Sequence, residues 1–444
     1  MIISFPFSHS YGLYSKRLYD ITLYQELGNT LSSRATGFFR VEKIGGRFWF
    51  IDPEGNLFLS KGVNHVNYLG DYAPSLGYSP YNRYVMEKYG SVEKWVKETI
   101  ARLRSWGFNT IGAWSSEETF CEEMPYTIIL DIALKAGANW QSGMIADYFS
   151  KKFERVAEDI ASKICTPRRN DKYLLGYFTD NELRWAPDWR SKKDLFDDYM
   201  LLPPEAEGKN ALVNFLREKY GEVRLLNEAW GSSFSSFDEI LSTTCVPKTP
   251  GVEADRSGFL KQIARRYFKV TYDAIKKYDP NHLVLGCRFA YKPPDEVLEG
   301  CVGYVDVISI NCYTNPYSND LTMRLADFKR IHDVTGLPIM ITEFSFKAMD
   351  SGLPNTKGAG IPVKTQSERA KYYEEYVKAI IKQPFIIGYH WFQYFDQPYE
   401  GRFDGENSNY GLVTIRDEPW EILIRKATSV NLKAEALHLN PKEN

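Results

Sequence analysis

Residues 174–182 read LLGYFTDNE, an apolar run whose last residues are acidic or carry an amide. A strand that is buried on both faces has this composition, because its apolar side chains pack against a covering layer on either side. Acidic groups at the end of such a run cost stability unless they are paired or functional. Seven further apolar, β-branched runs have the same character, at residues 57–66, 108–114, 127–134, 283–289, 305–313, 338–344 and 385–395.

Amphipathic helical patterns separate several of these runs. Apolar residues recur at three- and four-residue spacing within residues 92–103, 259–274 and 370–380. Thr365 and Glu368 have capping-box spacing before the third pattern, so a helix should begin there. Buried strands that alternate with helices indicate an α/β protein with a parallel sheet covered by helices. Eight strands favour closure of that sheet into a (β/α)8 TIM barrel over an open doubly wound sheet.

Other segments interrupt or flank this alternation. Gly45-Gly46 and residues 52–56 (DPEGN) are turn signals, which predict a β-hairpin packed on the barrel. Residues 183–255 carry a helix pattern of their own, which predicts a helical insertion after the fourth strand, beside the mouth of the barrel. The expected segments are an N-terminal extension with the hairpin at 1–55, the barrel at 56–430 with its insertion, and a C-terminal tail at 431–444.

The composition excludes several classes of function. A formal net charge of -2 gives no basic field for nucleic acid, and no apolar run is long enough to cross a membrane. The six cysteines include no C-x-x-C pair and no metal or nucleotide motif is found, so neither metal nor cofactor is expected. The N-terminus lacks the basic and apolar regions of a signal peptide, which predicts a cytoplasmic protein. A homo-oligomer is left open.

Two glutamates stand where the catalytic groups of a barrel lie, at the carboxyl ends of strands. Glu182 ends the fourth apolar run and Glu343 lies near the end of the seventh. Each alone could equally form a salt bridge at a strand end, but their joint position favours catalysis. Two carboxyl groups across a barrel mouth are the requirement of glycoside hydrolysis, in which one protonates the leaving oxygen and the other attacks the anomeric carbon.

This hypothesis makes Glu182 the general acid/base and Glu343 the nucleophile of a retaining double displacement. A carboxyl separation of ~5–5.5 Å is then expected, which is the spacing for retention. The pKa of the acid/base glutamate should be raised, because the neighbouring carboxylate disfavours a second negative charge. The aromatic content of 15% is compatible with stacking on sugar rings, although most aromatic side chains of any fold belong to its core.

The Asn181-Glu182 pair and Glu343 resemble the signature of the large clan of retaining β-glycosidases whose catalytic glutamates lie on strands four and seven. The resemblance implies that Asn181 hydrogen-bonds the sugar 2-hydroxyl. It also implies that Tyr313, after strand six, steadies the nucleophile. Trp391, at the end of strand eight, would form the floor of the −1 subsite.

More narrowly, the chain resembles the agarases of glycoside hydrolase family 50, over blocks that span most of residues 39–420. An insertion segment is similar to the β-galactosidases of family 42, through residues 215–221, 226–227 and 229–231. Family-50 agarases usually carry a further N-terminal domain, whereas about forty residues precede the first block here, so an oligosaccharide or simple β-galactoside is expected rather than polymeric agar. The blocks that match family 50 are residues 107–112 with Trp114-Ser115, 176–178 with 180–183, 285–286 with 288–289, 390–394 with Asp396, 401–402, 405–407 and Gly411.

Further candidates for substrate binding carry competing structural interpretations. Arg288 ends strand five and could hold a catalytic carboxylate as readily as touch substrate. Trp185, just past the acid/base, could line a leaving-group subsite or pack within the insertion. Asp131 lies inside the third run and is interpreted as a structural partner. The other candidates are His65 and Asn64 at the end of strand one, Trp114 at the end of strand two, and His390, Gln393 and Asp396 around Trp391.

The expected reaction is thus cofactor-free hydrolysis of a β-galactosyl-type or agaro-oligosaccharide substrate. A β-glucoside, β-mannoside or β-glucuronide would be hydrolysed by the same mechanism and is the first alternative. The second alternative is a carbohydrate-binding barrel without catalysis, which the presence of both glutamates disfavours.

Overall fold

The computed structural model describes residues 33–441 of the chain. Residues 1–32 and 442–444 lie outside the described part. These include most of the extension expected at residues 1–55, the end of the tail expected at 431–444, and the N-terminal segment on which the prediction of a cytoplasmic protein rests.

Nine parallel strands form one curled sheet in the order β8-β7-β6-β5-β4-β12-β11-β10-β9. The two edge strands, β8 and β9, are consecutive in the chain and are separated only by Cys287 and Arg288. The sheet therefore curls until its two edges belong to one chain segment. The strands are β4 (Ser60–Val63), β5 (Thr110–Ile111), β6 (Tyr126–Ile129), β7 (Leu174–Phe178), β8 (Leu283–Gly286), β9 (Phe289–Ala290), β10 (Ile308–Asn311), β11 (Ile339–Phe344) and β12 (Ile386–Trp391).

The predicted α/β class and parallel sheet are confirmed, and each of the eight predicted runs overlaps a strand. The third run extends too far, because residues 132–134 belong to the helix α4 (Ile132–Ala136). This helix starts where the Asp180 carboxylate accepts hydrogen bonds from the backbone N–H groups of Ala133 and Leu134 (2.8 and 3.2 Å). Satisfied N–H groups at a helix start are the usual reason for a helix to begin at that point.

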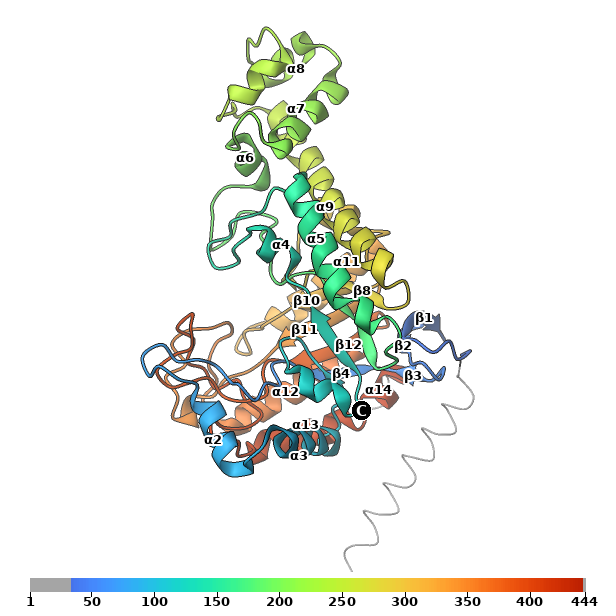
Figure 1. Ribbon diagram of the computed structural model, residues 1–444, viewed down its shortest axis with the longest axis vertical. Helices are drawn as coiled ribbons and strands as arrows, with labels where there is room; N and C mark the ends of the chain where they lie inside the picture. Colours follow the sequence, from blue (N-terminus) through green and yellow to red (C-terminus); the bar gives the residue numbers. More distant parts are fainter. Residues whose placement is uncertain (1–32, 442–444) are drawn as a thin grey trace, which may run out of the picture.

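Helices cover the sheet between most of its strands (Figure 1). The helix predicted after Thr365 begins there, and the Thr365 hydroxyl accepts from the Glu368 N–H (3.2 Å). Between β5 and β6 the chain makes only a 3-10 helix, η1 (Glu117–Cys121), which departs from strict alternation. The covering helices are α2 (Pro80–Tyr89), α3 (Val92–Ser105), α5 (Lys151–Ile164), α9 (Pro250–Tyr278), α10 (Asp295–Cys301), α11 (Asp320–Thr335), α12 (Gln366–Ile381), α13 (Glu421–Asn431) and α14 (Ala434–Leu439), with 3-10 turns η2 (Thr166–Arg168) and η4 (Met349–Ser351).

A small antiparallel sheet closes the amino end of the curled sheet. Its strands are β1 (Arg40–Ile44), β2 (Arg47–Ile51) and β3 (Leu57–Phe58), and Gly45 and Gly46 form the predicted hairpin turn with positive φ (59° and 81°). Phe50 packs in one cluster with sheet-interior residues such as Leu285 and Met340. The interior of the curled sheet is therefore filled with side chains, and only its carboxyl end is available for a site.

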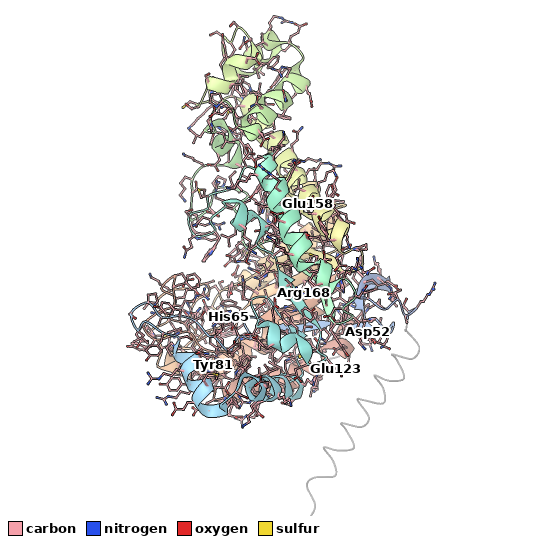
Figure 2. All side chains as sticks on the ribbon, viewed as in Figure 1. Asp52, His65, Tyr81, Glu123, Glu158 and Arg168 are labelled. Carbon is pink, nitrogen blue, oxygen red and sulfur yellow. The ribbon has the colours of Figure 1, made fainter. Side chains whose placement is uncertain are left out.

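The insertion at 183–255 forms a helical lobe at the far end of the long helices α5 and α9 (Figure 1). Glu158 lies midway along α5 (Figure 2) and accepts a hydrogen bond from the Tyr278 hydroxyl of α9 (2.9 Å). Inside the lobe, the buried Asp255 carboxylate accepts from Trp230 Nε1 (2.7 Å) and the Tyr220 hydroxyl (2.9 Å). The lobe contains α6 (Leu195–Met200), α7 (Glu207–Tyr220), α8 (Val223–Trp230), η3 (Phe237–Ser242) and the start of α9.

Among residues 33–441, no helix combines the length and the apolar composition that crossing a lipid bilayer requires. The predicted C-terminal tail differs from the structure, because residues 434–439 form α14. His438 of this helix is buried, and its two ring nitrogens lie within hydrogen-bond distance of the Ile381 and Phe48 carbonyls (2.6 and 3.0 Å).

Asp417 joins α2 and α3 to the segment that follows β12. Its buried carboxylate accepts from the hydroxyls of Tyr81 and Tyr89 (3.0 and 2.6 Å) and pairs with Lys88 and Arg102 (2.9 and 2.8 Å). Asp417→Asn keeps the shape but removes the charge. We expect the free energy of unfolding in urea to fall by about 2 kcal/mol, less than for a fully buried pair because Lys88 is partly exposed.

Asp333→Asn is the matched control for this substitution. Asp333 pairs with Lys329 on the exposed face of α11 (2.6 Å), where an ion pair contributes little. An equal loss of stability in both variants would contradict the special role of Asp417.

Candidate active site

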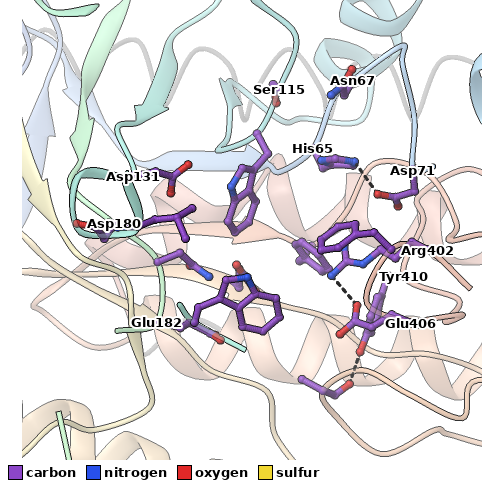
Figure 3. Close-up of a pocket in the computed structure, with 18 of the residues that line it drawn as sticks. His65, Asn67, Asp71, Ser115, Asp131, Asp180, Glu182, Arg402, Glu406 and Tyr410 are labelled. Atoms are coloured by element: carbon purple, nitrogen blue, oxygen red, sulfur yellow. Dashed lines mark hydrogen bonds and ion pairs between the residues drawn. The ribbon is translucent and has the colours of Figure 1, made fainter. Parts of the chain in front are cut away.

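A cavity of about 500 Å³ opens at the carboxyl end of the curled sheet. Its wall is made by residues at the ends of the strands and in the loops that follow them, so side chains distant in sequence meet there (Figure 3). This volume suits a small-molecule ligand. Residues of the wall include His65 and Asn67 after β4, Trp114 and Ser115 after β5, Asp131 after β6, Asp180, Asn181 and Glu182 after β7, Tyr313 after β10, Glu343 of β11, and Phe392, Arg402, Glu406 and Tyr410 after β12.

Glu182 and Glu343 both face this cavity and are joined by a chain of polar contacts. Asn311 Nδ2 donates to Glu182 Oε1 and to Asn181 Oδ1 (both 3.0 Å). The buried guanidinium of Arg288 donates to the same Asn181 Oδ1 (2.9 Å) and forms an ion pair with Glu343 Oε1 (3.0 Å). The two carboxylates, which are 161 positions apart in sequence, therefore belong to one network.

Burial raises the pKa of the Glu343 carboxyl to about 7, and the negative charge of Glu182 adds to this effect. The Arg288 guanidinium and the Tyr313 hydroxyl, which donates to Glu343 Oε2 (2.7 Å), act in the opposite direction. The sequence predicted the raised pKa for Glu182. That expectation for Glu182 stays a prediction, and the raised pKa of Glu343 follows from the place of its side chain within β11, where it is buried.

The comparisons with known proteins agree with this geometry. The glycosyl hydrolase 42 family, described as Beta-galactosidase, matches residues 137–380, more than half of the chain. The chain belongs to this family. The expected resemblance to family-50 agarases with a family-42-like segment is confirmed, and the relatives named below are glycosidases.

Two curated relatives come from Vibrio sp. (strain JT0107). The chain is 29% identical to Beta-agarase B, over 90% of this chain and 48% of the relative, and 27% identical to Beta-agarase A, over 91% and 47%. The chain thus spans about half the length of the curated relatives it matches.

Solved agarase structures have the same fold. An exo-beta-agarase superposes with a TM-score of 0.81 at 25% identity, covering 92% of this chain and 66% of that one. The agarase AgWH50C superposes with a TM-score of 0.80 at 24% identity, covering 99% and 72%. The agarase matches cover at least nine-tenths of this chain, whereas the family-42 match at residues 137–380 includes Glu182 and Glu343 but not β4, β5, β6 or β12.

The structure brings several of the predicted substrate-binding residues of this family member to the cavity wall. Asn181, Tyr313, His65 and Trp114 all line it. His65 Nε2 lies 3.2 Å from Asp71 Oδ1, which fixes the imidazole ring at the rim (Figure 3). Arg288 lies behind the wall, where it forms an ion pair with Glu343. This position fits the interpretation in which Arg288 holds a catalytic carboxylate.

Trp391 does not line the cavity. It faces α12 instead, 5.5 Å from Tyr373 between ring centroids, while the next residue, Phe392, forms part of the wall. Consecutive strand residues point to opposite faces of the sheet. A prediction that is wrong by one position therefore assigns a core residue to the cavity wall. Trp391, predicted as the floor of the −1 subsite, is thus a core residue, and Phe392 is its aromatic neighbour on the cavity wall.

The other residues predicted around Trp391 are also structural in position. His390 is fully buried inside the sheet, with Nε2 2.9 Å from Ser60 Oγ, and burial lowers its pKa to about 3. Gln393 donates to Asp71 Oδ2 (3.0 Å) from behind the wall. Asp396 accepts from Trp420 Nε1 (2.9 Å) and organises the loop after β12.

Asn64 and Trp185 differ from the prediction as well. Asn64 is fully buried and bridges strands, because its Nδ2 donates to the Thr342 carbonyl (2.8 Å). Trp185 is buried against α9, where its ring stacks on Phe268 at 5.7 Å. Of residues 183–255 only Leu183 lines the described cavity, so the insertion extends away from it.

Sequence reasoning missed much of the opposite wall. Asp71, Arg402, Glu406 and Tyr410 lie there, and Arg402 pairs with Glu406 (2.9 Å; Figure 3). Residues 401–402 and 405–407 match the family-50 agarases in sequence, but they lie in a loop, and loop residues carry no periodic signal that would place them on the wall. Within residues 33–441 no group of three or more metal-ligating side chains is found.

Tyr313→Phe tests the electrostatics of Glu343 without requiring turnover. The Tyr313 hydroxyl favours the ionised form of Glu343, so its removal should raise the pKa of that carboxyl by about one unit. The measurement is a ¹³C NMR titration of labelled glutamate carboxyls, with Glu343→Gln identifying the resonance. Tyr410→Phe is the control, because the Tyr410 hydroxyl donates to the Ala359 carbonyl rather than to Glu343. A lowered or unchanged pKa in Tyr313→Phe would contradict the assignment.

Proposed function

We propose that this protein hydrolyses a β-galactosyl-type or agaro-oligosaccharide substrate with retention of configuration, with Glu182 as general acid/base and Glu343 as nucleophile. The observation that carries the proposal is the network that ties both carboxylates to one cavity through Asn311, Asn181 and Arg288. The family-42 match and the agarase relatives support the choice of sugar. We further infer that the curled sheet is a (β/α)8 barrel in which β8 and β9 are the two halves of the fifth strand.

In the first step the ionised Glu343 carboxylate attacks the anomeric carbon while Glu182 gives its proton to the leaving oxygen. Arg288 and Tyr313 hold the Glu343 carboxylate through one oxygen each, which fixes the direction of attack. The glycosyl-enzyme ester then forms and the sugar that carries the leaving oxygen departs.

In the second step Glu182, now ionised, takes a proton from water, which attacks the anomeric carbon and releases Glu343. Asn181 accepts two hydrogen bonds at its Oδ1, from Arg288 and Asn311, so its amide nitrogen is left to donate toward the cavity. A sugar hydroxyl next to the anomeric carbon would accept that hydrogen bond. Trp114 and Phe392, 6.1 Å apart between ring centroids, supply apolar wall for the sugar ring.

The test compares the unaltered protein with Glu182→Gln and Glu343→Gln on p-nitrophenyl glycosides and agaro-oligosaccharides. Glu343→Gln should abolish turnover of both kinds of substrate. Glu182→Gln should lose roughly 10²–10⁴-fold on oligosaccharides, which need a protonated leaving group, and much less on p-nitrophenyl β-galactoside, which does not. Glu299→Gln, on the exposed face of α10, is the control and should keep full activity.

Stereochemistry and rescue separate retention from inversion. NMR of the first product should show the β-anomer, and azide should restore turnover of Glu343→Ala with formation of an α-glycosyl azide. Azide rescue of Glu182→Ala as a β-glycosyl azide would confirm the acid/base role. A first product with the α-anomer, or turnover that survives Glu343→Ala without azide, would refute the proposal.

A further inference from the structure

Asp131 lies on the cavity wall between the residues that follow the two neighbouring strands. It follows β6, which pairs with β5 on one side and β7 on the other. Trp114 and Glu182, which follow those two strands, line the same wall. The sequence placed Asp131 inside a strand as a structural partner, whereas the structure places its partly buried carboxylate on the wall of the cavity that Glu182 also lines (Figure 3).

The Asp131 carboxylate differs from the other carboxylates of the wall in its contacts. Within residues 33–441 the Asp131 side chain has no hydrogen bond or ion pair, although the positive charges of Lys135 and Arg288 act to lower its pKa. Each of the others has a partner: Asp71 has Gln393 (3.0 Å), Asp180 has the Tyr267 hydroxyl (2.7 Å), Glu182 has Asn311 (3.0 Å), Glu343 has Tyr313 (2.7 Å), and Glu406 has Gln397 (2.6 Å).

The backbone at Asp131 matches that of other wall residues. His65, Trp114, Asp131 and Glu182 follow four successive strands of the sheet, and all have φ between 48° and 60°. Non-glycine residues rarely adopt this conformation, and where they do the strain is often associated with function. Asp131 and Glu182 thus share a positive φ after neighbouring strands, and both line the one cavity.

An acidic group in this position is costly in the empty protein. Burial raises the pKa of Asp131, and Lys135 and Arg288 offset this only partly. A partly buried carboxylate without a protein partner is left to solvent in the empty protein, and the hydroxyl groups of a ligand can replace that solvent. Hydroxyl groups are the donors that a sugar brings, and a carboxylate can accept two of them.

We propose that Asp131 is a specificity-determining residue that accepts hydrogen bonds from the hydroxyls of a neutral sugar ring held beside Trp114 and Glu182. The inference rests on the proposed hydrolysis and deepens it, because it selects neutral sugars over anionic ones at this subsite. A sulfate or carboxylate group on the same ring position is repelled by Asp131. A sugar that lacks the hydroxyl leaves the carboxylate unpaired.

The experiment measures kcat/KM for p-nitrophenyl β-galactoside and its 2-, 3-, 4- and 6-deoxy analogues. In the unaltered protein, removal of the hydroxyl that faces Asp131 should cost roughly ten- to hundredfold, the effect of one hydrogen bond to a charged group. In Asp131→Ala that same deoxy analogue should react as fast as the parent sugar. The unaltered protein should prefer the parent sugar over the analogue that is sulfated at that same position, and Asp131→Asn should reduce this ratio of kcat/KM values at least tenfold.

Asp180→Asn is the matched control, because its carboxylate is fully buried nearby and is hydrogen-bonded to Ala133 and Leu134 N–H groups. Asp180→Asn should lower the Tm and should reduce kcat/KM by the same factor for the parent sugar and for every analogue. Asp131→Asn should leave the Tm unchanged or raised, since no protein contact is lost. A lowered Tm together with a uniform loss in Asp131→Asn would overturn the inference in favour of a structural role.

Binding separates failure of this inference from failure of the proposed hydrolysis. Galactose and agaro-oligosaccharides are titrated against tryptophan fluorescence in the unaltered protein and in Asp131→Ala. Sugar binding that is lost in Asp131→Ala, without turnover in the unaltered protein, would sustain the Asp131 role and refute hydrolysis. Turnover with an unchanged deoxy pattern in Asp131→Ala would do the reverse. If no sugar is bound or hydrolysed, both are refuted.

Discussion

The rest of the site depends on one fully buried guanidinium, that of Arg288. It sits at the break between β8 and β9, with φ of 46°, and contacts Asn181 Oδ1, the Thr342 carbonyl and Glu343. A buried charge is tolerated only when it is paired and hydrogen-bonded, so Arg288 and Glu343 each depend on the other. The break between the two edge strands β8 and β9 therefore also positions the counter-charge against Glu343. Its guanidinium further lies 4.3 Å from the centre of the Trp114 ring, which couples the apolar wall to the same group.

Much of this arrangement follows from sequence, because buried parallel strands are apolar throughout and end where polar residues begin. That rule located all eight strand regions, and it placed Glu182, Asn181, Tyr313 and Glu343 at one edge, where the structure has them together. It could not decide which face a side chain takes. Trp391 and Phe392 are adjacent aromatic residues in a run that is buried on both sides. The composition therefore does not show which of the two faces the cavity and which faces the covering helices. The roles of the glutamates themselves remain predictions.

Loops and insertions were less predictable for a different physical reason. The pattern of residues 211–216 shows that the insertion contains a helix, but the direction of a lobe is set by tertiary packing. Here the 29-residue helix α9 carries the lobe outward, and Asp255 near its start holds Trp230 and Tyr220. Residues 401–410 lack periodicity altogether, so Arg402 and Glu406 could be placed on the wall only once the loop after β12 was in view.

A reaction that passes through a cationic sugar would explain why acidic side chains outnumber basic ones on the cavity wall. The wall carries Asp71, Asp131, Asp180, Glu182, Glu343 and Glu406, whereas Arg402 is its one guanidinium among the described residues. Such an excess of carboxylates is unfavourable in the empty protein: burial raises the pKa of Glu343, and the negative charges of Glu182 and Glu406 add to this effect. A neutral sugar adds no charge on binding, but an oxocarbenium-like transition state adds a positive one. The same negative potential that destabilises the free protein then stabilises the transition state more than the bound substrate, which is the condition for catalysis.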